Sequence, residues 1–261
     1  MTLAGIDFAR LYREHMAAAG RTPMRADDWD ARAAQAGKRL THGGYADAFI
    51  ARMDLTDCDS LLDVGCGNGA LCLPLAARLR RIVALDYSPA MLDALRADAH
   101  AQGADNIDAR LCAWEDDWSA IPACDIAIAS RSMHVADMAD ALAKLHAKAR
   151  RRVYLTHRTG GYGVPLDIVQ ALEHRRPPPP DHLYVLNLLH GMGLQPRVDY
   201  LDGGGAALVT EFDDLLRRTV RALGPLDADQ QARLRRWHER QPPLRMLPRR
   251  WAFIRWETAR D

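Results

Sequence analysis

An apolar, strand-like segment runs directly into a turn with three glycines, and this junction constrains the fold more than any other part of the chain. Residues 61–70 read Leu-Leu-Asp-Val-Gly-Cys-Gly-Asn-Gly-Ala. The apolar half suits a short buried strand, whereas Gly65, Gly67 and Gly69 let the backbone turn with positive φ and approach a ligand closely. Leucines then recur every fourth residue from Leu71, which predicts a helix whose first free N–H groups face that ligand.

Two classes of cofactor are compatible with the glycine turn taken alone. Gly65, Gly67 and Ala70 satisfy the loose dinucleotide-binding fingerprint, in which alanine can replace the third glycine. Asp63 favours another ligand, because a carboxylate two residues before the first glycine repels a pyrophosphate and attracts an ammonium or hydroxyl group. The next apolar segment ends in Asp86, and a carboxylate at a strand end can accept hydrogen bonds from both hydroxyls of a ribose. A nucleotide-type cofactor is therefore expected, with its class still open.

The glycine turn and the segment after it carry a family resemblance. Residues 83–92 read Val-Ala-Leu-Asp-Tyr-Ser-Pro-Ala-Met-Leu, and with residues 61–70 they resemble the first two motifs of class I S-adenosylmethionine-dependent methyltransferases. The resemblance implies S-adenosyl-L-methionine as cofactor and S-adenosyl-L-homocysteine as product. In that family the acid before the glycine loop helps to bind the methionine end of the cofactor, and the acid after the second strand holds the ribose. The cofactor residues implied in this way are Asp63, Gly65, Cys66, Gly67, Gly69 and Asp86, with Tyr87 and Met91 packing on the adenine.

Short apolar segments alternate with helical segments through the middle of the chain, which predicts βαβ units and a parallel sheet. The strands are mostly apolar throughout, as expected where helices cover both faces of the sheet. The resemblance implies an α/β fold with a doubly wound, mostly parallel, Rossmann-like sheet of seven strands, the last antiparallel. Strands are expected at residues 60–65, 81–86, 107–112, 125–130, 152–157, 197–201 and 251–257, and helices at 70–80, 89–102, 136–149 and 182–192.

Two helical segments precede the glycine turn and are candidates for a lid over the cofactor. They span about residues 6–19 and 29–53, with a break at a glycine pair in the second. Aromatic rings that face a sulfonium cation stabilise it, and Trp29 and Tyr45 are candidates for that role, although Tyr45 also has the spacing of a core residue. We therefore assign residues 1–54 to an N-terminal helical lid segment.

The rest of the chain, residues 55–261, is assigned to one methyltransferase domain with an insertion. Residues 211–223 and 227–240 have helical patterns separated by a Gly-Pro pair, which predicts a helical insertion at about residues 206–245, before the last strand. In this family the segment before the first motif and the insertions before the last two strands usually build the acceptor pocket.

The third cofactor element should follow the strand at residues 107–112. Many family members carry an adenine-binding acid there, but this chain has Ala113 at that position. Trp114 could instead lie flat on the purine, and Glu115 or a backbone carbonyl could accept its amino group. The alternative is that Trp114 and Trp118 are packing residues under a turn.

The fourth element is the end of the strand at residues 125–130, where polar residues lie beside the glycine turn. Ligands of open α/β sheets bind at this edge, so Ser130 is counted among the cofactor residues. Arg131 stands where the family often has asparagine, and its guanidinium suggests an anionic acceptor or a clamp for the cofactor carboxylate. His134 matches a histidine frequent in small-molecule members and could accept a proton from the acceptor, although a histidine at such a junction can also be structural. Arg131 and His134 are the candidate catalytic residues.

The charge of the chain as a whole gives no reason to expect a nucleic-acid partner. The formal net charge is +1, so no global field draws the protein to nucleic acid or to acidic membranes. Residues 217–255 hold eleven arginines against Asp227, Asp229 and Glu239, a local basic excess that could hold RNA. No interleaved aromatic platform or known RNA-binding module accompanies these arginines. We therefore expect a small-molecule acceptor.

The five cysteines are odd in number and form no C-x-x-C pair, which argues against a zinc site or a disulfide framework. We expect reduced thiols and no metal. The N-terminus meets a charge at Asp7, too early for the apolar core of a signal peptide, and no apolar run approaches the roughly 20 residues of a membrane span. A cytoplasmic protein without a membrane partner is expected, and the sequence does not indicate the oligomeric state.

Three functions remain open at this level. The leading one is a methyltransferase that moves the sulfonium methyl to a small-molecule acceptor by in-line displacement, where positioning and exclusion of water are the main tasks of the protein. The second is a nicotinamide-dependent oxidoreductase with the same glycine turn, which Asp63 and Gly69 disfavour. The third is a non-catalytic protein that binds S-adenosylmethionine, which would account for the departures at Ala113 and Arg131.

Overall fold

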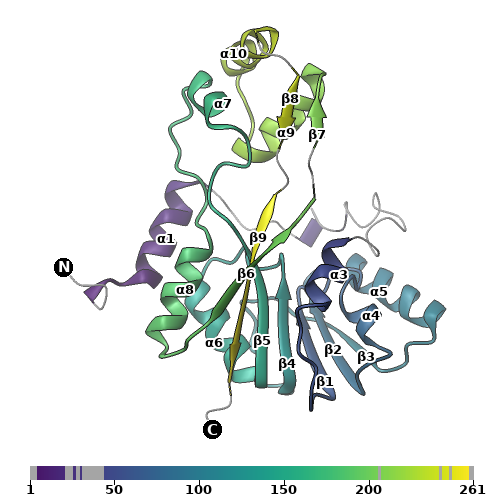
Figure 1. Ribbon diagram of the computed structural model, residues 1–261. Helices are drawn as coiled ribbons and strands as arrows, with labels where there is room; N and C mark the ends of the chain where they lie inside the picture. The colour runs from purple at the N-terminus through teal and green to yellow at the C-terminus, as the bar shows by residue number, and fades with distance from the viewer. Residues whose placement is uncertain are drawn as a thin grey trace.

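The structure is a computed structural model that describes residues 5–20, 26–27, 30, 44–204, 207–240, 243–246 and 249–258. Its centre is a seven-stranded sheet in the order β3-β2-β1-β4-β5-β9-β6 (Figure 1). The pairs from β3 to β5 are parallel, and β9 is antiparallel to both of its neighbours. This confirms the doubly wound, mostly parallel sheet. The strands are β1 (Ser60–Val64), β2 (Arg81–Asp86), β3 (Ile107–Leu111), β4 (Cys124–Ser130), β5 (Ala149–Arg158), β6 (Arg197–Asp202) and β9 (Arg250–Glu257).

Helices cover both faces of the sheet, and successive strand residues point to opposite faces. Leu61 joins the core on one side and Leu62 the core on the other. The strand order reverses between β1 and β4, so the ligand crevice of such a sheet lies at the carboxyl ends of these strands. Within the described ranges, no helix is long and apolar enough to cross a membrane. The face of the sheet that carries Leu61 packs on α3 (Gly44–Ile50), α4 (Cys72–Leu75) and α5 (Pro89–Gln102). The face that carries Leu62 packs on α1 (Phe8–Ala18), α6 (Met138–Lys148) and α8 (His182–Gly191).

The helix α5, which follows β2, has clear start and stop signals. The side chain of Ser88 accepts the N–H of Met91 at 3.2 Å, and Pro89 occupies the first turn, where its missing N–H costs nothing. Gly103 ends the helix in a left-handed conformation, with φ of 65°. These signals place the N-terminus of α5 next to the end of β2.

The helix predicted at residues 70–80 is shorter than expected, because α4 is a single turn. Pro74 lies inside it and has no backbone N–H to donate to the preceding turn. Ala76 then donates its N–H to the carbonyl of Leu73 at 3.2 Å, an i to i+3 bond that tightens the end of the turn. The leucine spacing that suggested a long helix therefore reflects buried packing residues in a chain of turns.

The N-terminal segment is described only in part. The helix α1 confirms the first expected helix, and α3 begins at the glycine pair where the break in the second was expected. The hydroxyl of Tyr12 on α1 donates to the carbonyl of Val135 at 2.7 Å in the buried interior. Trp29 and residues 31–43 lie outside the described residues, so a lid formed by residues 1–54 stays a prediction.

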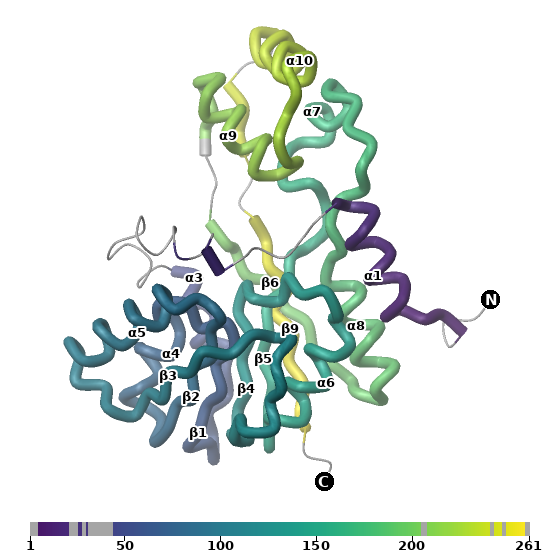
Figure 2. The backbone as a smooth tube through the Cα atoms, turned by 180° about the vertical axis from the view of Figure 1, so that it is seen from behind, coloured from purple at the N-terminus to yellow at the C-terminus, as the bar shows by residue number. Residues whose placement is uncertain are grey.

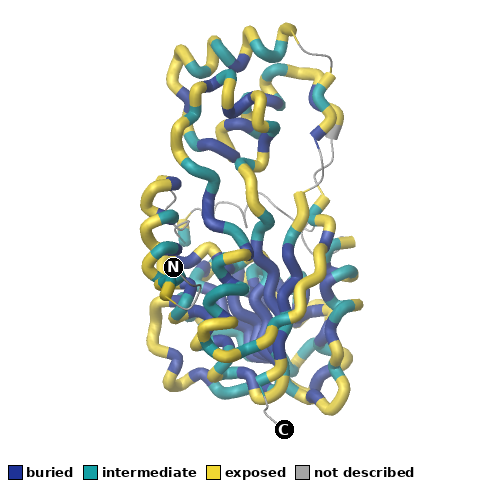
Figure 3. The backbone as a smooth tube through the Cα atoms, turned by 60° about the vertical axis from the view of Figure 1, so that its left-hand side comes forward, coloured by how far each residue is buried: buried dark blue, intermediate teal, exposed yellow. Residues whose placement is uncertain are grey.

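A smaller lobe stands beyond the carboxyl ends of β5 and β6 (Figures 1 and 2). Its own apolar core includes Ile168, Leu215 and Leu234, which are fully buried. Figure 3 shows buried segments inside the lobe apart from those of the sheet. The lobe contains the expected helical pair as α9 (Phe212–Leu223) and α10 (Ala228–Glu239), and three elements that the sequence did not indicate: α7 (Leu166–Ala171), β7 (Ala207–Val209) and its antiparallel partner β8 (Leu244–Met246).

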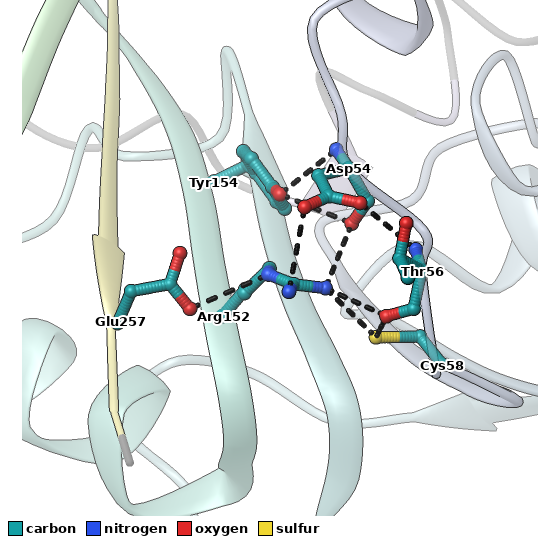
Figure 4. Close-up of polar contacts among 6 residues, drawn as sticks. All are labelled: Asp54, Thr56, Cys58, Arg152, Tyr154 and Glu257. Atoms are coloured by element: carbon teal, nitrogen blue, oxygen red, sulfur yellow. Dashed lines mark hydrogen bonds and ion pairs between the residues drawn. The ribbon is translucent and has the colours of Figure 1, made fainter. Parts of the chain in front are cut away.

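Arg152 on β5 ties the segment before β1 to the sheet (Figure 4). Its guanidinium donates to the carbonyl of Thr56 at 2.8 Å and forms ion pairs with Asp54 (3.4 Å) and with Glu257 on β9 (3.3 Å). The hydroxyl of Tyr154 donates to the carbonyl of Asp54 at 3.2 Å and accepts its N–H at 3.0 Å. These contacts fix the chain at its entry to β1, the strand that leads into the glycine turn.

Candidate active site

The glycine turn after β1 has positive φ angles at all three glycines, with 69° at Gly65, 55° at Gly67 and 92° at Gly69. Two of these glycines are also enclosed. A Cβ on Gly65 would lie 2.3 Å from the Cβ of Ser132, and one on Gly69 would lie 2.5 Å from a methyl group of Leu95. Side chains are therefore excluded, and the turn packs directly on α5 and on the residues that follow β4.

Asp86, at the end of β2, holds the glycine turn from the neighbouring strand. One carboxylate oxygen accepts the N–H of Gly67 at 2.8 Å, and the other accepts the N–H of Ser88 at 2.9 Å. Asp86 is buried, and this burial raises the pKa of its carboxyl group. Each oxygen has a further lone pair, so the carboxylate can still accept hydroxyl groups from a ligand at this edge.

Asp63 is almost fully buried, and one of its oxygens is unsatisfied. The residue is 2% exposed, and Oδ2 has no hydrogen-bond partner within the described part of the chain. Burial, followed by the negative charge of Asp86, raises the pKa of Asp63 to about 7. A ligand ammonium would supply the missing donor and a compensating charge. The methionine end of S-adenosylmethionine carries such a group, so the residues present fit that cofactor.

Met91 lies against the glycine turn, where packing on the adenine was expected. It is buried on α5, and its sulfur is 4.0 Å from the position that a Cβ on Gly67 would take. Tyr87, directly after Asp86, is half-buried. Burial raises the pKa of the Cys66 thiol well above its usual value, so Cys66 is a neutral lining residue of the turn rather than a nucleophile.

Trp114 has the packing role that the sequence left open. Its ring nitrogen donates to the carbonyl of Ser132 at 3.1 Å, and its ring stacks on Trp118 with the centroids 5.3 Å apart. Trp118 in turn donates to the carbonyl of Ala113 at 2.9 Å. Trp114 thus braces the turn after β4. Its contact with an adenine stays a prediction, as does the role of the exposed Glu115.

Tyr45 on α3 reaches the ends of β4 and β5. Its hydroxyl lies 2.9 Å from Oγ of Ser130 and 2.7 Å from Oγ1 of Thr156. Ser130 and Thr156 are paired neighbours in the parallel register of β4 and β5. Thr156 was missed by the sequence reasoning, although its place at a strand end next to Ser130 was a usable signal, because the carboxyl ends of parallel strands share one edge.

Arg131 follows β4 in a left-handed conformation, with φ of 58°. Its N–H donates to Oγ1 of Thr156 at 3.0 Å, and its guanidinium carbon lies 4.3 Å from the ring centroid of Tyr45. His134, the other candidate catalytic residue, is exposed three residues further along. The structure therefore joins Arg131 to the cluster around Tyr45 and places His134 on the turn beyond it.

Asp30, which no sequence signal marked, connects the N-terminal segment to the site. Its Oδ1 accepts the hydroxyl of Ser88 at 2.5 Å and the N–H of Ala90 at 3.3 Å. Its negative charge also contributes to the raised pKa of Asp86. The contact spans 58 residues of sequence, so no local pattern could have indicated it.

Comparisons with known proteins agree with this fold. Residues 61–152 match the family model described as a methyltransferase domain. An uncharacterized protein of Haemophilus influenzae is 30% identical over 267 residues, which covers 100% of both chains. The solved structure of the YcgJ protein of Bacillus subtilis has a TM-score of 0.60 at 14% identity, over 84% of this chain and 100% of that one. Phospholethanolamine N-methyltransferase 2 of Haemonchus contortus, in complex with phosphomonomethylethanolamine and S-adenosylhomocysteine, has a TM-score of 0.57 at 14% identity, over 94% of this chain and 59% of that one.

The fold and the family match define a class I S-adenosylmethionine-dependent methyltransferase, and the chain belongs to that family. It is an enzyme of this class, with the Haemophilus influenzae protein as a relative over its full length. The nicotinamide-dependent oxidoreductase, which shared the loose glycine fingerprint, is thereby set aside.

Proposed function

We propose that the protein transfers the methyl group of S-adenosyl-L-methionine to a small-molecule acceptor by in-line displacement. The observation that carries the proposal is the buried Oδ2 of Asp63, which has no hydrogen-bond partner among the described residues and lies beside a glycine turn that Asp86 holds from the next strand. The cofactor carries the groups that suit these acids, an ammonium for Asp63 and ribose hydroxyls for Asp86. When bound, it supplies a methyl group that is already electrophilic. The tasks of the protein are therefore to bind and orient the cofactor and the acceptor and to exclude water.

The other predicted residues take supporting roles in this proposal. Gly65, Cys66, Gly67 and Gly69 let the backbone approach the methionine end closely. Tyr45, near the start of α3, and Ser130, at the end of β4, are proposed to line the side of the cofactor site that faces the acceptor, where the methyl group is transferred. The adenine side is proposed to consist of Tyr87, Met91, Trp114 and Glu115.

The lobe supports a small acceptor rather than a nucleic acid. Some of the arginines that suggested RNA binding are paired with acids of the lobe itself. Arg218 forms an ion pair with Asp214 at 2.9 Å, and Arg233 forms one with Asp229 at 2.7 Å and another with Glu173. These pairs reduce the charge that could attract phosphates, and the position of the lobe beyond the carboxyl ends of β5 and β6 suits the wall of an acceptor pocket (Figure 1).

His134 is proposed to accept the proton that the acceptor loses. His134 lies on the turn after β4, at the sheet edge proposed for the cofactor and the acceptor, and an imidazole can accept a proton from an acceptor. His134→Gln should lower turnover and leave the dissociation constant of S-adenosylmethionine unchanged. Equal turnover in the two proteins would limit His134 to a structural role.

Two measurements test the proposed function. Calorimetric titration should show binding of S-adenosylmethionine and S-adenosylhomocysteine, and no comparable binding of NAD. Incubation of the protein with S-adenosylmethionine labelled with tritium in the methyl group and a bacterial extract should place label in the small-molecule fraction. Tight binding without transfer to any fraction would indicate a non-catalytic binding protein. Label found only in RNA or protein would overturn the small-molecule acceptor.

A further inference from the structure

We propose that Arg131 recognises an anionic group, a carboxylate or a phosphate, on the methyl acceptor, and that Tyr45 positions its guanidinium. The inference rests on the proposed function and specifies the chemistry of the acceptor. Its basis is the cluster formed by Tyr45, Ser130, Arg131 and Thr156, in which Tyr45 and Ser130 have proposed roles beside the cofactor and Arg131 and Thr156 do not.

Arg131 directly follows β4, at the carboxyl edge of the sheet where the cofactor site is proposed. The next residue, Ser132, donates its hydroxyl to the carbonyl of Val64 at 2.7 Å and packs against Gly65. The turn that carries Arg131 is therefore seated on the glycine turn itself. A side chain on this turn is one residue away from the wall of the cofactor site.

The backbone of Arg131 is held in an unfavourable conformation. A residue with a β-carbon rarely adopts a φ of 58°, because the left-handed region crowds that carbon against the backbone. The hydrogen bond from its N–H to Thr156 stabilises this conformation. Strained residues of this kind are concentrated at functional sites, where the surrounding structure holds them in place.

Tyr45 gives the guanidinium a fixed support. The ring lies 4.3 Å from the guanidinium carbon, and the hydroxyl at its far end is held between Ser130 and Thr156. Contact with the ring face leaves the N–H groups in the guanidinium plane available, and a planar fork of donors matches a carboxylate or a phosphate. Arg131 is thus oriented before any ligand arrives.

The charge of Arg131 is uncompensated within the described residues. The side chain is exposed, and no carboxylate of the described chain forms an ion pair with it. Arg152 on the neighbouring strand differs, since Asp54 and Glu257 both pair with it. An exposed guanidinium that Tyr45 orients and that has no acid partner among the described residues suits an anion.

The test uses small probes and the full-length protein loaded with S-adenosylhomocysteine. Benzoate, phenyl phosphate and the neutral benzamide are titrated calorimetrically. At least one of the two anions should bind at least about tenfold more tightly than benzamide, as expected for a charge-assisted hydrogen-bonded pair. The preferred anion then identifies a carboxylate or a phosphate as the group recognised.

The variants distinguish the contribution of Arg131 to anion affinity from that of the residues around it. Arg131→Met keeps the length of the side chain and the same left-handed backbone cost, and it should reduce anion affinity to that of benzamide. Arg131→Lys should keep part of the affinity, and Tyr45→Leu should weaken it about threefold through loss of the ring contact. Arg197→Met, which removes an exposed arginine at the amino edge of the sheet, is the control and should leave anion affinity unchanged.

Three results would overturn the proposal. One is equal binding of all three probes by the wild-type protein, a result that does not depend on whether any variant folds. Another is unchanged anion affinity in a folded Arg131→Met protein. The third is a loss of about tenfold in the affinity of Arg131→Met for S-adenosylhomocysteine itself, because Arg131 would then clamp the cofactor carboxylate. The titrations do not depend on turnover, so a protein that binds the anion and transfers no methyl group would count against the proposed function alone.

Discussion

The carboxylate of Asp86 accepts the backbone N–H of Gly67 at 2.8 Å, which ties the glycine turn after β1 to the end of β2. Its second oxygen accepts the N–H of Ser88, where α5 begins. One buried acid therefore sets the relative positions of the turn and of the helix beside it. Any contact that Asp86 makes with a ribose is added to this structural role.

Asp86→Asn should weaken the binding of S-adenosylmethionine by about tenfold or more, because the amide keeps one acceptor oxygen in place of two. Asp86→Ala should also lower the free energy of unfolding, by about 1–3 kcal/mol for each backbone N–H left without an acceptor. Titration calorimetry and thermal unfolding measure the two effects separately. Unchanged affinity in Asp86→Asn would remove this residue from the ligand site.

Gly69→Ala should destabilise the fold more than Gly193→Ala. Both glycines have positive φ, 92° and 77°, and a β-carbon in the left-handed region costs about 1–2 kcal/mol at either position. Of the two, Gly69 is crowded, since its Cβ would lie 2.5 Å from Leu95 and 2.8 Å from Leu73, whereas no described residue lies within 4 Å of a Cβ at Gly193. Overpacking should add about 1–3 kcal/mol at Gly69, measured by urea unfolding. Equal losses would show that the turn can relax around a side chain.

Arg152→Met should lower the free energy of unfolding by about 2–4 kcal/mol, because its guanidinium is largely buried among two carboxylates and backbone carbonyls that would lose their partner. Arg150→Met, two residues away, is the matched control. Arg150 is exposed and its ion pair with Asp125 is 3.6 Å long, so its removal should cost less than about 1 kcal/mol. Similar decreases in the free energy of unfolding of the two variants would contradict a stabilising role for the contacts of Arg152 with Asp54 and Glu257.

His157 on β5 should make the protein lose stability in acid. Burial lowers the pKa of this imidazole from 6.5 to about 4, and Arg158, Asp181 and His182 add smaller effects of both signs. The unfolded chain takes up the proton below about pH 6.5 and the folded protein only below about pH 4, so acid favours unfolding. About 2–3 kcal/mol should be lost between pH 6.5 and 4.5.

The measurement is urea unfolding of the wild-type protein and of His157→Gln at both pH values. The variant should show the smaller decrease in the free energy of unfolding. Asp63 acts in the opposite direction, because its raised pKa adds stability in acid that is lost as pH rises from 3.8 toward 7. That contribution is common to both proteins, so the difference between them isolates His157. Equal decreases would be inconsistent with a neutral, buried His157.

The parallel part of the sheet could be predicted from the sequence because short apolar segments alternate with helical ones, and the count of seven strands with an antiparallel last strand follows from the family resemblance. Asp63, the glycines and Asp86 could be predicted as a site because they lie within 24 residues of sequence and share a resemblance to known motifs.

The rest of the site depends on contacts that no local pattern contains. The hydroxyl of Tyr45 meets Thr156 across 111 residues, and Asp30 meets Ser88 across 58. The strands β7 and β8 are three residues each, too short for an alternating pattern to be recognised. Tertiary packing decides such elements, so they become visible only in the structure.

The pH dependence of S-adenosylmethionine binding is the decisive measurement for the proposed site. Asp63 has a pKa of about 7 in the free protein, and only its ionised form attracts the ammonium of the cofactor. The dissociation constant of the wild-type protein should rise about 25-fold between pH 7.5 and 5.5, as expected for one proton that competes with the ligand. Asp63→Asn should bind more weakly at pH 7.5 and show no such dependence. Equal affinity of the wild-type protein at the two pH values, or the same slope in the variant, would contradict a cofactor bound through Asp63.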